Sequence, residues 1–446
     1  MSGRDTIAAI ATAPGRGGVA VVRVSGPQAF VLAEKLTGDV PRPGRVRFVR
    51  LRDPASSVSR LPSDSERDLR RETKDIIDEG ILLAFGGPHS YTGEDVVEFQ
   101  CHGGAVTPRR VLEACFAAGA RLARRGEFTE RAFLNGKLDY DQAESVLDLI
   151  DAKTVRAADA ALEGLGGRRT RACRALYETA LDLSTRLEHA LDIDEGELPA
   201  DFLPSLASSV SRLGSALREA IRRANEGRLL NAGALVVLAG PPNAGKSSLL
   251  NALLEENRAI VSDVPGTTRD SVEAWIDLDG WPVRLVDTAG LRDAGDEIEA
   301  EGVRRSEELI ARADVVVWLQ VLASGRDGRF IPVHPKCDLG RGEGLNVSAK
   351  TGEGLEELKR AIVTKLEEKV AAADAAEPSS GELSGLYAAL APLTSLAAGL
   401  TSPGPCDLVL AANGLRSVAE RLGSLVGAVY SDDLLDHLFS RFCVGK

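Results

Sequence analysis

The segment GPPNAGKSS at 240–248 constrains the fold of this chain more than any other stretch. It follows an apolar run, ALVVLAG at 234–240, and precedes LLNALL, which has the composition of a helix. A buried strand, a glycine loop and a helix in this order, with the spacing G-x-x-x-x-G-K-S, indicate a phosphate-binding P-loop. The alternative, a fortuitous glycine-rich turn, does not explain the strand before the loop or the helix after it.

The loop residues have specific expected roles. Glycines let backbone amides approach the phosphates, and the helix N-terminus adds positive potential. Lys246 is expected to bridge the β- and γ-phosphates, and the Ser247 hydroxyl is expected to ligate Mg²⁺. The residues expected at the phosphates are Asn243, Ala244, Gly245, Lys246, Ser247 and Ser248.

Two further segments complete the phosphate site. Asp287-Thr288-Ala289-Gly290 follows the strand-like run VRLV. We expect Asp287 to hold Mg²⁺ through water and the Gly290 amide to sense the γ-phosphate. Between this segment and the P-loop lies SDVPGTTRD at 262–270, where Thr268 is the natural second hydroxyl for Mg²⁺. Such a loop orders with GTP and relaxes after hydrolysis.

Recognition of the base is expected from two later segments. Pro335-Lys336-Cys337-Asp338 stands where the guanine signature Asn-Lys-x-Asp should follow a strand. Asp338 can accept from guanine N1 and N2, and the Lys336 stem can pack on the base. Pro335 has no amide side chain, so guanine selection could be looser. Ser348-Ala349-Lys350 fits the last guanine loop, with the Ala349 amide on O6. GTP is therefore expected rather than ATP.

The catalytic groups for hydrolysis are less evident. The position after Gly290, where Ras-like enzymes carry a water-orienting Gln, holds Leu291. Asn243 could help coordinate a monovalent cation in the place of an arginine finger. Glu299, within DEIEAEGVRRSEELIARA, could orient water, although the pattern by itself favours a solvated helix carboxylate.

The chain changes character three times along its length of 446 residues, a length that suggests about two to four domains. Residues 1–127 mix strands, expected at 6–12, 18–26, 78–87 and 94–104, with helices. Residues 128–228 are helical, with one clear amphipathic stretch at 142–165. Residues 229–372 alternate strands and helices, as a parallel sheet covered on both faces does. After a linker at about 371–385, residues 373–446 return to helix. This order suggests an α/β domain inserted into a discontinuous helical domain.

Composition narrows the classes of function. The net charge of −12 excludes bulk nucleic-acid affinity, so any such contact must be local or shared with a partner. The six cysteines form no C-x-x-C pair, which argues against a zinc site or disulfide framework. The N-terminus lacks the apolar core of a signal peptide, and no apolar run approaches the length of a membrane span. We expect a cytoplasmic protein without a membrane partner.

Several of these segments together resemble the tRNA-modification GTPase family MnmE/TrmE. They are GPPNAGKSSLLNAL, VPGTTRD, DTAGLRDAGDEIEAEG, the C-terminal FCVGK, and, in the first third, DTIAAIATAPGRGGVAVVRVSG, YTGEDVVEFQCHGG and RRGEFTERAFLNGKLDYDQAE. The resemblance covers nearly the whole chain, and other P-loop GTPases do not carry the first-third and terminal motifs.

The resemblance implies a fold and an assembly. It implies an α/β P-loop GTPase (Ras-like) domain inserted into an all-α domain and preceded by an α+β folate-binding domain, which dimerises with its copy. The two G domains meet when GTP and K⁺ are bound, and this activates hydrolysis. The K⁺ site matches Asn243, Ser262, Val264 and Thr267, and the water-orienting residue matches Glu299.

The resemblance also implies a reaction and its cofactors. The family modifies the wobble uridine of certain tRNAs at C5, as carboxymethylaminomethyluridine, with a one-carbon unit from a tetrahydrofolate (5-formyl or 5,10-methylene). It works with a flavoprotein partner, MnmG, that holds FAD and uses NADH, in a heterotetramer or larger complex. The folate contacts match Arg23, Glu98, Lys137 and Lys446.

The residues themselves leave alternatives open. Glu98 could pair with pterin N–H groups while Arg23 and Lys137 hold carboxylates or carbonyls, but surface salt bridges are the simpler interpretation. Cys443 could be a nucleophile if cations lower its pKa, or a helix-packing thiol. His102 has no companion and is interpreted as structural.

The chain departs from the family pattern at three places. Two other functions are also compatible with part of the sequence. The departures are Pro335, a short segment at 319–334, and a longer, more charged stretch at 52–75. A regulatory or ribosome-associated GTPase without modification chemistry would share the nucleotide motifs but have no use for the first domain. Pro335 also raises the possibility of a scaffold that binds nucleotide without hydrolysing it.

Overall fold

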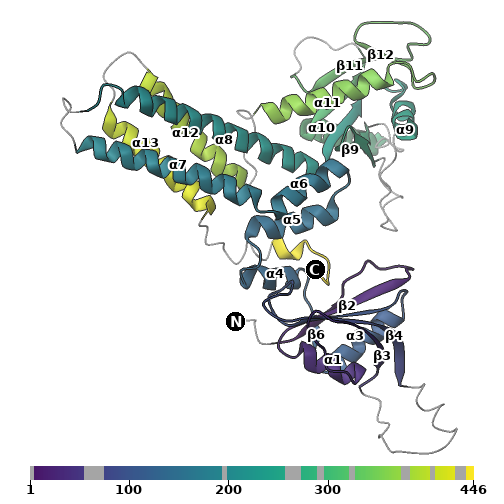
Figure 1. Cartoon of the computed structure of the whole chain (residues 1–446). Helices are drawn as coiled ribbons and strands as arrows, with labels where there is room; N and C mark the ends of the chain where they lie inside the picture. Colours follow the sequence, from purple (N-terminus) through teal and green to yellow (C-terminus); the bar gives the residue numbers. More distant parts are fainter. Residues whose placement is uncertain are drawn as a thin grey trace, which may run out of the picture. The chain divides into compact units, whose positions relative to one another are not determined.

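The structure is a computed structural model that describes residues 5–54, 75–192, 198–256, 273–288, 296–320, 327–372, 382–401, 407–426 and 438–446. The chain divides into two compact units (Figure 1). One unit joins Met1–Leu147 to Val429–Lys446, and the other comprises Asp148–Ala428. The two ends of the chain therefore share a unit, and the nucleotide motifs lie in the other.

The first unit is built on a mixed sheet in the order β3-β4-β5-β2-β1-β6. Neighbouring strands are antiparallel except for the parallel pair β1 and β6. The strands are β1 (Ile7–Ile10), β2 (Val19–Ser25), β3 (Val46–Arg52), β4 (Ile76–Phe85), β5 (Val96–His102) and β6 (Arg121–Leu122). The four strands expected from the sequence are thus confirmed. The edge strand β3 was missed because arginines alternate with its only two buried residues, Val49 and Leu51.

The two faces of this sheet carry different layers. Helices α1 (Ala29–Thr37) and α3 (Thr107–Ala117) pack on one face around a core that includes Leu32, Phe99 and Val111. Successive side chains of a strand point to opposite faces. Ile7 and Ala9 of β1 accordingly face the other way, where they pack with Phe128 of α4 (Glu127–Leu134).

The C-terminal residues complete this unit. Leu438, Phe439 and Phe442 are buried against Ala143 and Leu147 of α5 (Tyr140–Asp151). The first and last parts of the chain thereby form one hydrophobic cluster.

The second unit contains the helical domain expected on both sides of the insert. Its helices are α6 (Val155–Leu165), α7 (Arg168–Leu191), α8 (Phe202–Ala232), α12 (Glu382–Thr401) and α13 (Leu408–Val426). Helix α13 packs along α7, and α12 packs along α8 (Figure 1). Their shared core of leucines and alanines confirms that the segments before and after the insert form one domain.

One described helical segment, Leu383–Leu400 of α12, is long and apolar enough to cross a membrane by length and composition. Its residues Leu386, Ala389 and Leu393 are buried in the core shared by α7, α8, α12 and α13. These apolar side chains therefore have partners within the protein, as on the inner face of a bundle helix.

The amphipathic stretch at 142–165 forms two helices rather than one. Helix α5 ends at Asp151, and α6 begins at Val155. Thr154 has extended backbone angles, and its Oγ1 accepts a hydrogen bond from the Ala157 amide at 3.2 Å. A threonine at this position caps a helix N-terminus and stabilises it by about 1 kcal/mol.

The inserted domain is a six-stranded sheet in the order β12-β11-β10-β7-β9-β8. All neighbours are parallel except β8 and β9. Its elements are β7 (Ala234–Ala239), α9 (Lys246–Glu256), β8 (Glu273–Leu278), β9 (Trp281–Asp287), α10 (Asp296–Arg312), β10 (Val315–Leu319), β11 (Phe330–Pro335), β12 (Leu345–Val347) and α11 (Leu355–Ala371). Strand β7 is buried along its whole length, as a central parallel strand requires. The expected inserted α/β domain is confirmed.

The β8–β9 hairpin joins this sheet to the helical domain. Its two-residue turn is Asp279-Gly280, with φ of 48° and 84°, which is the Asp-Gly chemistry of a tight hairpin. Thr154 Oγ1 donates to the Gly280 carbonyl at 2.7 Å. The Arg156 guanidinium lies 4.1 Å from the centroid of the Trp281 ring. Thr154 before α6 and Arg156 in its first turn thus hold the hairpin by a hydrogen bond and a cation–π contact.

We predict that Gly280→Ala destabilises the inserted domain by about 2 kcal/mol, because φ is positive and a Cβ would lie 2.9 Å from the Cβ of Arg156. All three tryptophans lie in this domain, so urea unfolding followed by tryptophan fluorescence measures the effect. Gly328→Ala, whose Cβ would meet nothing within 4 Å, is the matched control. Equal midpoints for the two variants would contradict the prediction.

Candidate functional site

The predicted phosphate loop lies at the carboxyl end of β7. The strand order reverses around β7, and such switch points are where open α/β sheets bind ligands. Lys246 is buried, and its Nζ donates to the carbonyls of Gly240 at 3.1 Å and Pro241 at 2.8 Å. Its ammonium group is therefore held inside the loop, where phosphate oxygens could replace the carbonyls.

The two residues expected at Mg²⁺ lie next to each other. Ser247, at the start of α9, donates from Oγ to Oδ2 of Asp287 at 2.5 Å. Asp287 is the last residue of β9 and is fully buried. The next residue, Thr288, donates to the Leu238 carbonyl at 3.0 Å and ties this end of β9 to β7.

These donors fit magnesium. A hydroxyl and a carboxylate are hard oxygen ligands, and Mg²⁺ commonly takes one or two protein groups together with phosphates and waters. In the described part of the chain no group of three or more His, Cys, Asp or Glu side chains could hold a metal by itself. The pair therefore suits a cation that arrives with a nucleotide.

A cavity of about 330 Å³ lies beside the loop, within the usual range for a small-molecule site. The P-loop, the end of β11 and the loop after β12 all contribute to its lining. The predicted nucleotide contacts that line it are Ala244, Gly245, Ser248, Lys336, Asp338, Ser348, Ala349 and Lys350. The structure thus brings together residues from three separate sequence motifs.

The residues predicted to recognise the base are held by hydrogen bonds. Ser348 is fully buried, and its Oγ donates to Oδ1 of Asp338 at 2.7 Å. Lys336 has a φ of 57° and donates from Nζ to the carbonyl of Asn243 at 3.1 Å, so it connects the base loop to the P-loop. Pro335 ends β11 and also lines the cavity. This departure from the family signature therefore leaves Lys336 and Asp338 at the cavity.

Several predicted residues lie outside the described part of the structure. They are Ser262, Val264, Thr267, Thr268, Ala289, Gly290 and Leu291. The charged stretch at 52–75 falls largely outside it as well. Glu299 lies on α10, but its side chain is not among those described. The roles expected for these residues remain predictions.

A second group of predicted residues gathers on the sheet of the first unit. Arg23 of β2 lies directly opposite Glu98 of β5, and Arg23 Nε donates to Glu98 Oε1 at 2.8 Å. The Arg23 guanidinium carbon lies 5.4 Å from the ring centroid of Tyr91 and 5.7 Å from that of Phe128. The pair is mostly shielded, with 17% and 16% of the two side chains exposed. Shielding strengthens an ion pair relative to one in open solvent.

The other residues of this group come from α4 and from the C-terminus. The Lys446 carbonyl accepts from the Phe128 amide at 3.2 Å, and the Cys443 carbonyl accepts from the Gly126 amide at 3.5 Å. Lys137, in the loop after α4, donates from Nζ to the Pro88 carbonyl at 3.0 Å. None of the described cysteines forms a disulfide, and Cys443 is exposed.

The terminal segment needs a glycine to reach this position. Gly445 has a φ of 104°, and a Cβ there would lie 2.3 Å from the Ile10 carbonyl oxygen and 3.0 Å from Ala11 Cα. Val444 forms a β-bridge with Arg125. The Cys-Val-Gly-Lys motif is therefore a docking segment whose glycine lets the backbone lie against β1.

Comparison with known proteins decides the family. Residues 6–137 match the model of the GTP-binding protein TrmE N-terminus, and residues 141–443 match that of the MnmE helical domain. The chain is 40% identical to the tRNA modification GTPase MnmE of Stutzerimonas stutzeri, with 99% of each chain covered. It is 41% identical to that of Alkalilimnicola ehrlichii, over 99% of this chain and 100% of the relative. This chain belongs to the MnmE family of tRNA modification GTPases.

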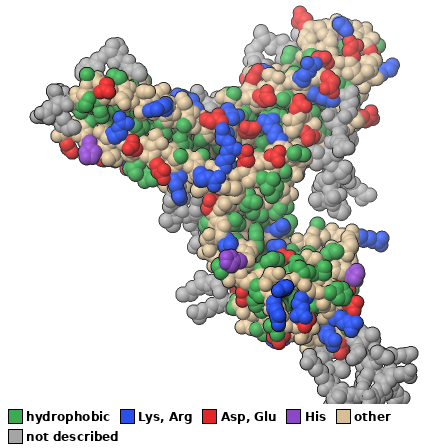
Figure 2. Space-filling view, in the orientation of Figure 1, with side chains coloured by type: hydrophobic (Ala, Val, Ile, Leu, Met, Phe, Trp, Pro, Cys, Tyr) green, Lys and Arg blue, Asp and Glu red, His purple; other side chains and the backbone are tan. Residues whose placement is uncertain are grey.

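Membership of the MnmE family establishes a GTP-binding GTP hydrolase that acts in tRNA modification, with tRNA as the macromolecule modified. Among solved structures, the G domain of the T. maritima FeoB iron transporter is similar at 25% identity, with a TM-score of 0.22, over 30% of this chain and 98% of that one. In the view of Figure 2, side chains of both charges are interspersed over the described surface.

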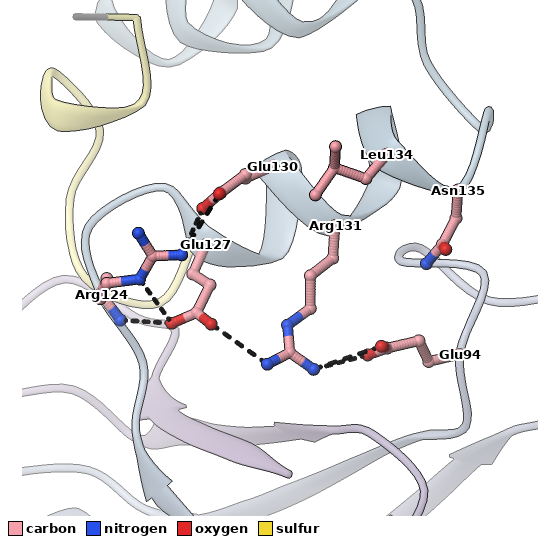
Figure 3. A pocket seen from close by; sticks show the side chains of 7 residues that line it. All are labelled: Glu94, Arg124, Glu127, Glu130, Arg131, Leu134 and Asn135. Atoms are coloured by element: carbon pink, nitrogen blue, oxygen red, sulfur yellow. Dashed lines mark hydrogen bonds and ion pairs between the residues drawn. The ribbon is translucent and has the colours of Figure 1, made fainter. Parts of the chain in front are cut away.

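In this MnmE-family chain, a network of buried charged side chains supports the sheet face that carries Arg23 and Glu98. The sequence pattern did not predict this network. Arg131 of α4 is 4% exposed and Glu127 is fully buried. Arg131 pairs with Glu94 at 3.1 Å and with Glu127 at 3.1 Å, on either side of its guanidinium, and the three residues line a cavity of about 70 Å³ (Figure 3). Arg131 also pairs with Asp5 at 2.8 Å, and Arg121 pairs with Glu127 at 2.5 Å. The sequence signal for this network was the four-residue spacing of Glu127 and Arg131. That spacing by itself predicts only an ion pair on the surface of a helix.

The network determines how Glu127 titrates. Burial by itself raises the pKa of Glu127, but hydrogen bonds from Arg121, the Arg124 amide and Arg131 outweigh it and bring the pKa down to about 2. The pKa of Glu127 is lower in the folded chain than its usual value of 4.5. The ionised carboxylate therefore stabilises the folded state at pH values above 4.5. The stabilisation is lost as the pH falls from about 4.5 towards about 2.

We predict that Glu127→Gln loses this acid sensitivity. The measurement is thermal unfolding of wild type and variant between about pH 7 and pH 3, because the difference between their curves isolates one carboxyl from the others. The wild type should be the more stable protein at neutral pH, and its advantage should shrink as the solution is acidified. A difference that is independent of pH would show that Glu127 does not titrate as the network requires.

Proposed function

We propose that this chain is a K⁺-activated GTPase that, with a flavoprotein partner, modifies C5 of the wobble uridine of certain tRNAs by using a tetrahydrofolate one-carbon unit. One observation carries the proposal: a single chain holds both a P-loop cavity and a second face where the terminal Cys-Val-Gly-Lys segment packs beside the Arg23–Glu98 pair. A regulatory or ribosome-associated GTPase, the alternative, has no use for the second face.

The nucleotide site supports in-line hydrolysis of GTP. Lys246 would exchange its two carbonyl partners for β- and γ-phosphate oxygens, and Ser247 and Asp287 would hold Mg²⁺, which neutralises charge on those oxygens. Thr268 would supply a second hydroxyl. Asp338, held by Ser348, would accept from the guanine edge, and the Ala349 amide would meet O6.

Leu291 stands where Ras-like enzymes carry a water-orienting Gln. Two other sets of residues would therefore supply catalysis. Asn243 has a φ of 59°, which places this residue of the loop in the left-handed region that asparagine tolerates. We propose that Asn243, together with Ser262, Val264 and Thr267, holds K⁺ where an arginine finger otherwise places its charge. Glu299 would orient the attacking water.

The first unit supports binding of a planar, carboxylate-bearing ligand such as a 5-formyl or 5,10-methylene tetrahydrofolate. Glu98 could accept from pterin N–H groups, while Arg23 offers a planar fork for a carbonyl or carboxylate. Lys137 and Lys446 could hold the glutamate tail. Cys443 is exposed beside this face, and we propose it as a nucleophile.

The family resemblance supports a proposal for the assembly. We propose a homodimer through the first domain, and a heterotetramer or larger complex with an MnmG-type partner that supplies FAD and NADH. The proposed domains are 1–127 for folate binding and dimerisation, 128–228 and 373–446 for the two parts of the helical domain, and 229–372 for the G domain. The compact units of the structure differ from these bounds, because they join Met1–Leu147 to Val429–Lys446. GTP hydrolysis would drive a conformational cycle and not the carbon chemistry itself.

Nucleoside analysis of tRNA tests the modification role. Cells that lack the protein should lose carboxymethylaminomethyl-type uridine, and expression of the wild type should restore it. Ser247→Ala and Arg23→Ala should each fail to restore it, because one removes the Mg²⁺ hydroxyl and the other a folate contact. Restoration by Arg23→Ala would count against folate chemistry at this face, and modification that never depends on the protein would refute the whole proposal.

The role of Glu299 has a separate test. Glu299→Ala should retain GTP binding but lose about 100-fold of the K⁺-stimulated hydrolysis rate, because the water is no longer oriented. Glu307→Ala, an exposed carboxylate on the same helix, is the control and should hydrolyse GTP like the wild type. The measurement is GTP turnover in K⁺ and in Na⁺ buffers. An unchanged rate for Glu299→Ala would remove this residue from the mechanism.

A further inference from the structure

The loop between β4 and β5 places an aromatic ring against the predicted folate contact Arg23. The guanidinium carbon of Arg23 lies 5.4 Å from the centroid of the Tyr91 ring and 5.7 Å from that of Phe128. Glu98 accepts from Arg23 Nε at 2.8 Å. In the described part of the chain, no group accepts a hydrogen bond from the two terminal guanidinium nitrogens of Arg23. Tyr91, Phe128 and Glu98 thus hold the Arg23 side chain, while its two terminal nitrogens stay available to a ligand.

The position of Tyr91 is itself tightly determined. The hydroxyls of Tyr91 and Thr129 lie 2.9 Å apart, and Thr129 is fully buried on α4. The next residue along the loop, Thr92, is held through its carbonyl by Asn135 Nδ2 at 2.7 Å. Glu94 then pairs with the buried Arg131 at 3.1 Å (Figure 3). The loop is therefore a rigid support, because three contacts join it to α4 and to the residue that caps its C-terminus.

We propose that Tyr91 is a positioning residue that holds the Arg23 guanidinium in the orientation in which it receives the pterin or formyl oxygen of the folate. This inference rests on the proposed folate function. An arginine side chain has several rotatable bonds, and ordering it at the moment of binding costs affinity. A ring stacked on the guanidinium removes that cost in advance and adds an attraction that grows when water is excluded.

The experiment compares two kinds of substitution at Tyr91 in the full-length protein. Tyr91→Phe keeps the ring and loses only the hydroxyl, whereas Tyr91→Leu and Tyr91→Met keep apolar volume and lose the ring. The probe is 5-formyltetrahydrofolate, titrated by calorimetry. We expect Tyr91→Phe to bind within about 2-fold of the wild type, and the two variants without the ring to bind about 5- to 30-fold more weakly.

Two controls separate positioning from general damage to the fold. Tyr177→Leu removes a partly buried ring from the helical domain, and it should leave the folate affinity unchanged. GTP hydrolysis should be the same in every Tyr91 variant, because Tyr91 and the P-loop lie in different compact units. If one ring-deleted variant does not fold, the other still provides the measurement.

A double substitution tests whether Tyr91 acts through Arg23. In an Arg23→Ala background, Tyr91→Leu should change the remaining affinity by less than about 2-fold, because the side chain that the ring positions is gone. A full additional loss would overturn the inference by showing that Tyr91 acts independently of Arg23.

The outcomes distinguish a failure of the proposed folate function from a failure of the role proposed for Tyr91. Failure of the wild type itself to bind 5-formyltetrahydrofolate would refute the folate part of the proposed function, and the inference with it. Binding by the wild type with equal affinity for Tyr91→Leu and Tyr91→Met would refute only the inference. A loss as large in Tyr91→Phe as in Tyr91→Leu would also refute it, because the hydroxyl and not the ring would then be responsible.

Discussion

The pairing of Arg131 with Glu127 and Glu94 is the interaction on which the first unit depends most. A buried charge without a partner costs several kcal/mol, so these groups must meet, and their meeting determines where α4 lies relative to the sheet. Helix α4 then carries Phe128 to Arg23 and receives the terminal backbone at its first turn. The loop from β4 to β5 is placed by the same network through Glu94. The predicted folate contacts thus share one electrostatic support.

The nucleotide half depends on a different constraint, the burial of parallel strands. Strand β7 is buried throughout, and it runs beside β9 with Leu238 opposite Asp287. That register brings the end of β9 to the start of α9, where Ser247 meets Asp287. The base loops follow from the neighbouring strands β11 and β12, whose ends meet at the same edge of the sheet. The packing of these parallel strands therefore brings together nucleotide motifs that are about a hundred residues apart in the sequence.

Much of the architecture could be predicted because it depends on local periodicity and on short motifs. The inserted α/β domain, the helical segments on each side and the four clear strands of the first domain all show in the pattern of apolar residues. The errors have physical causes. Strand β3 lies at a sheet edge where few residues need to be apolar, and the turn at Thr154 depends on one capping hydroxyl. Weaker base recognition at Pro335 stays a prediction, while Lys336 and Asp338 line the cavity, where hydrogen bonds with Asn243 and Ser348 hold them.

The amino-acid sequence by itself identified the P-loop and the terminal Cys-Val-Gly-Lys motif by residue type and spacing, and it predicted which residues would hold magnesium. Only the tertiary structure decided which of these residues act together. It placed Gly445 against β1, where no larger residue fits, and so brought the end of the chain to the face that carries Arg23 and Glu98. It also showed that Tyr91 and Arg131, which lie in quoted motifs but had no role assigned from the sequence, support that face. The reason is that periodicity and spacing report neighbours along the chain, whereas buried charges and close backbone contacts join residues more than a hundred positions apart.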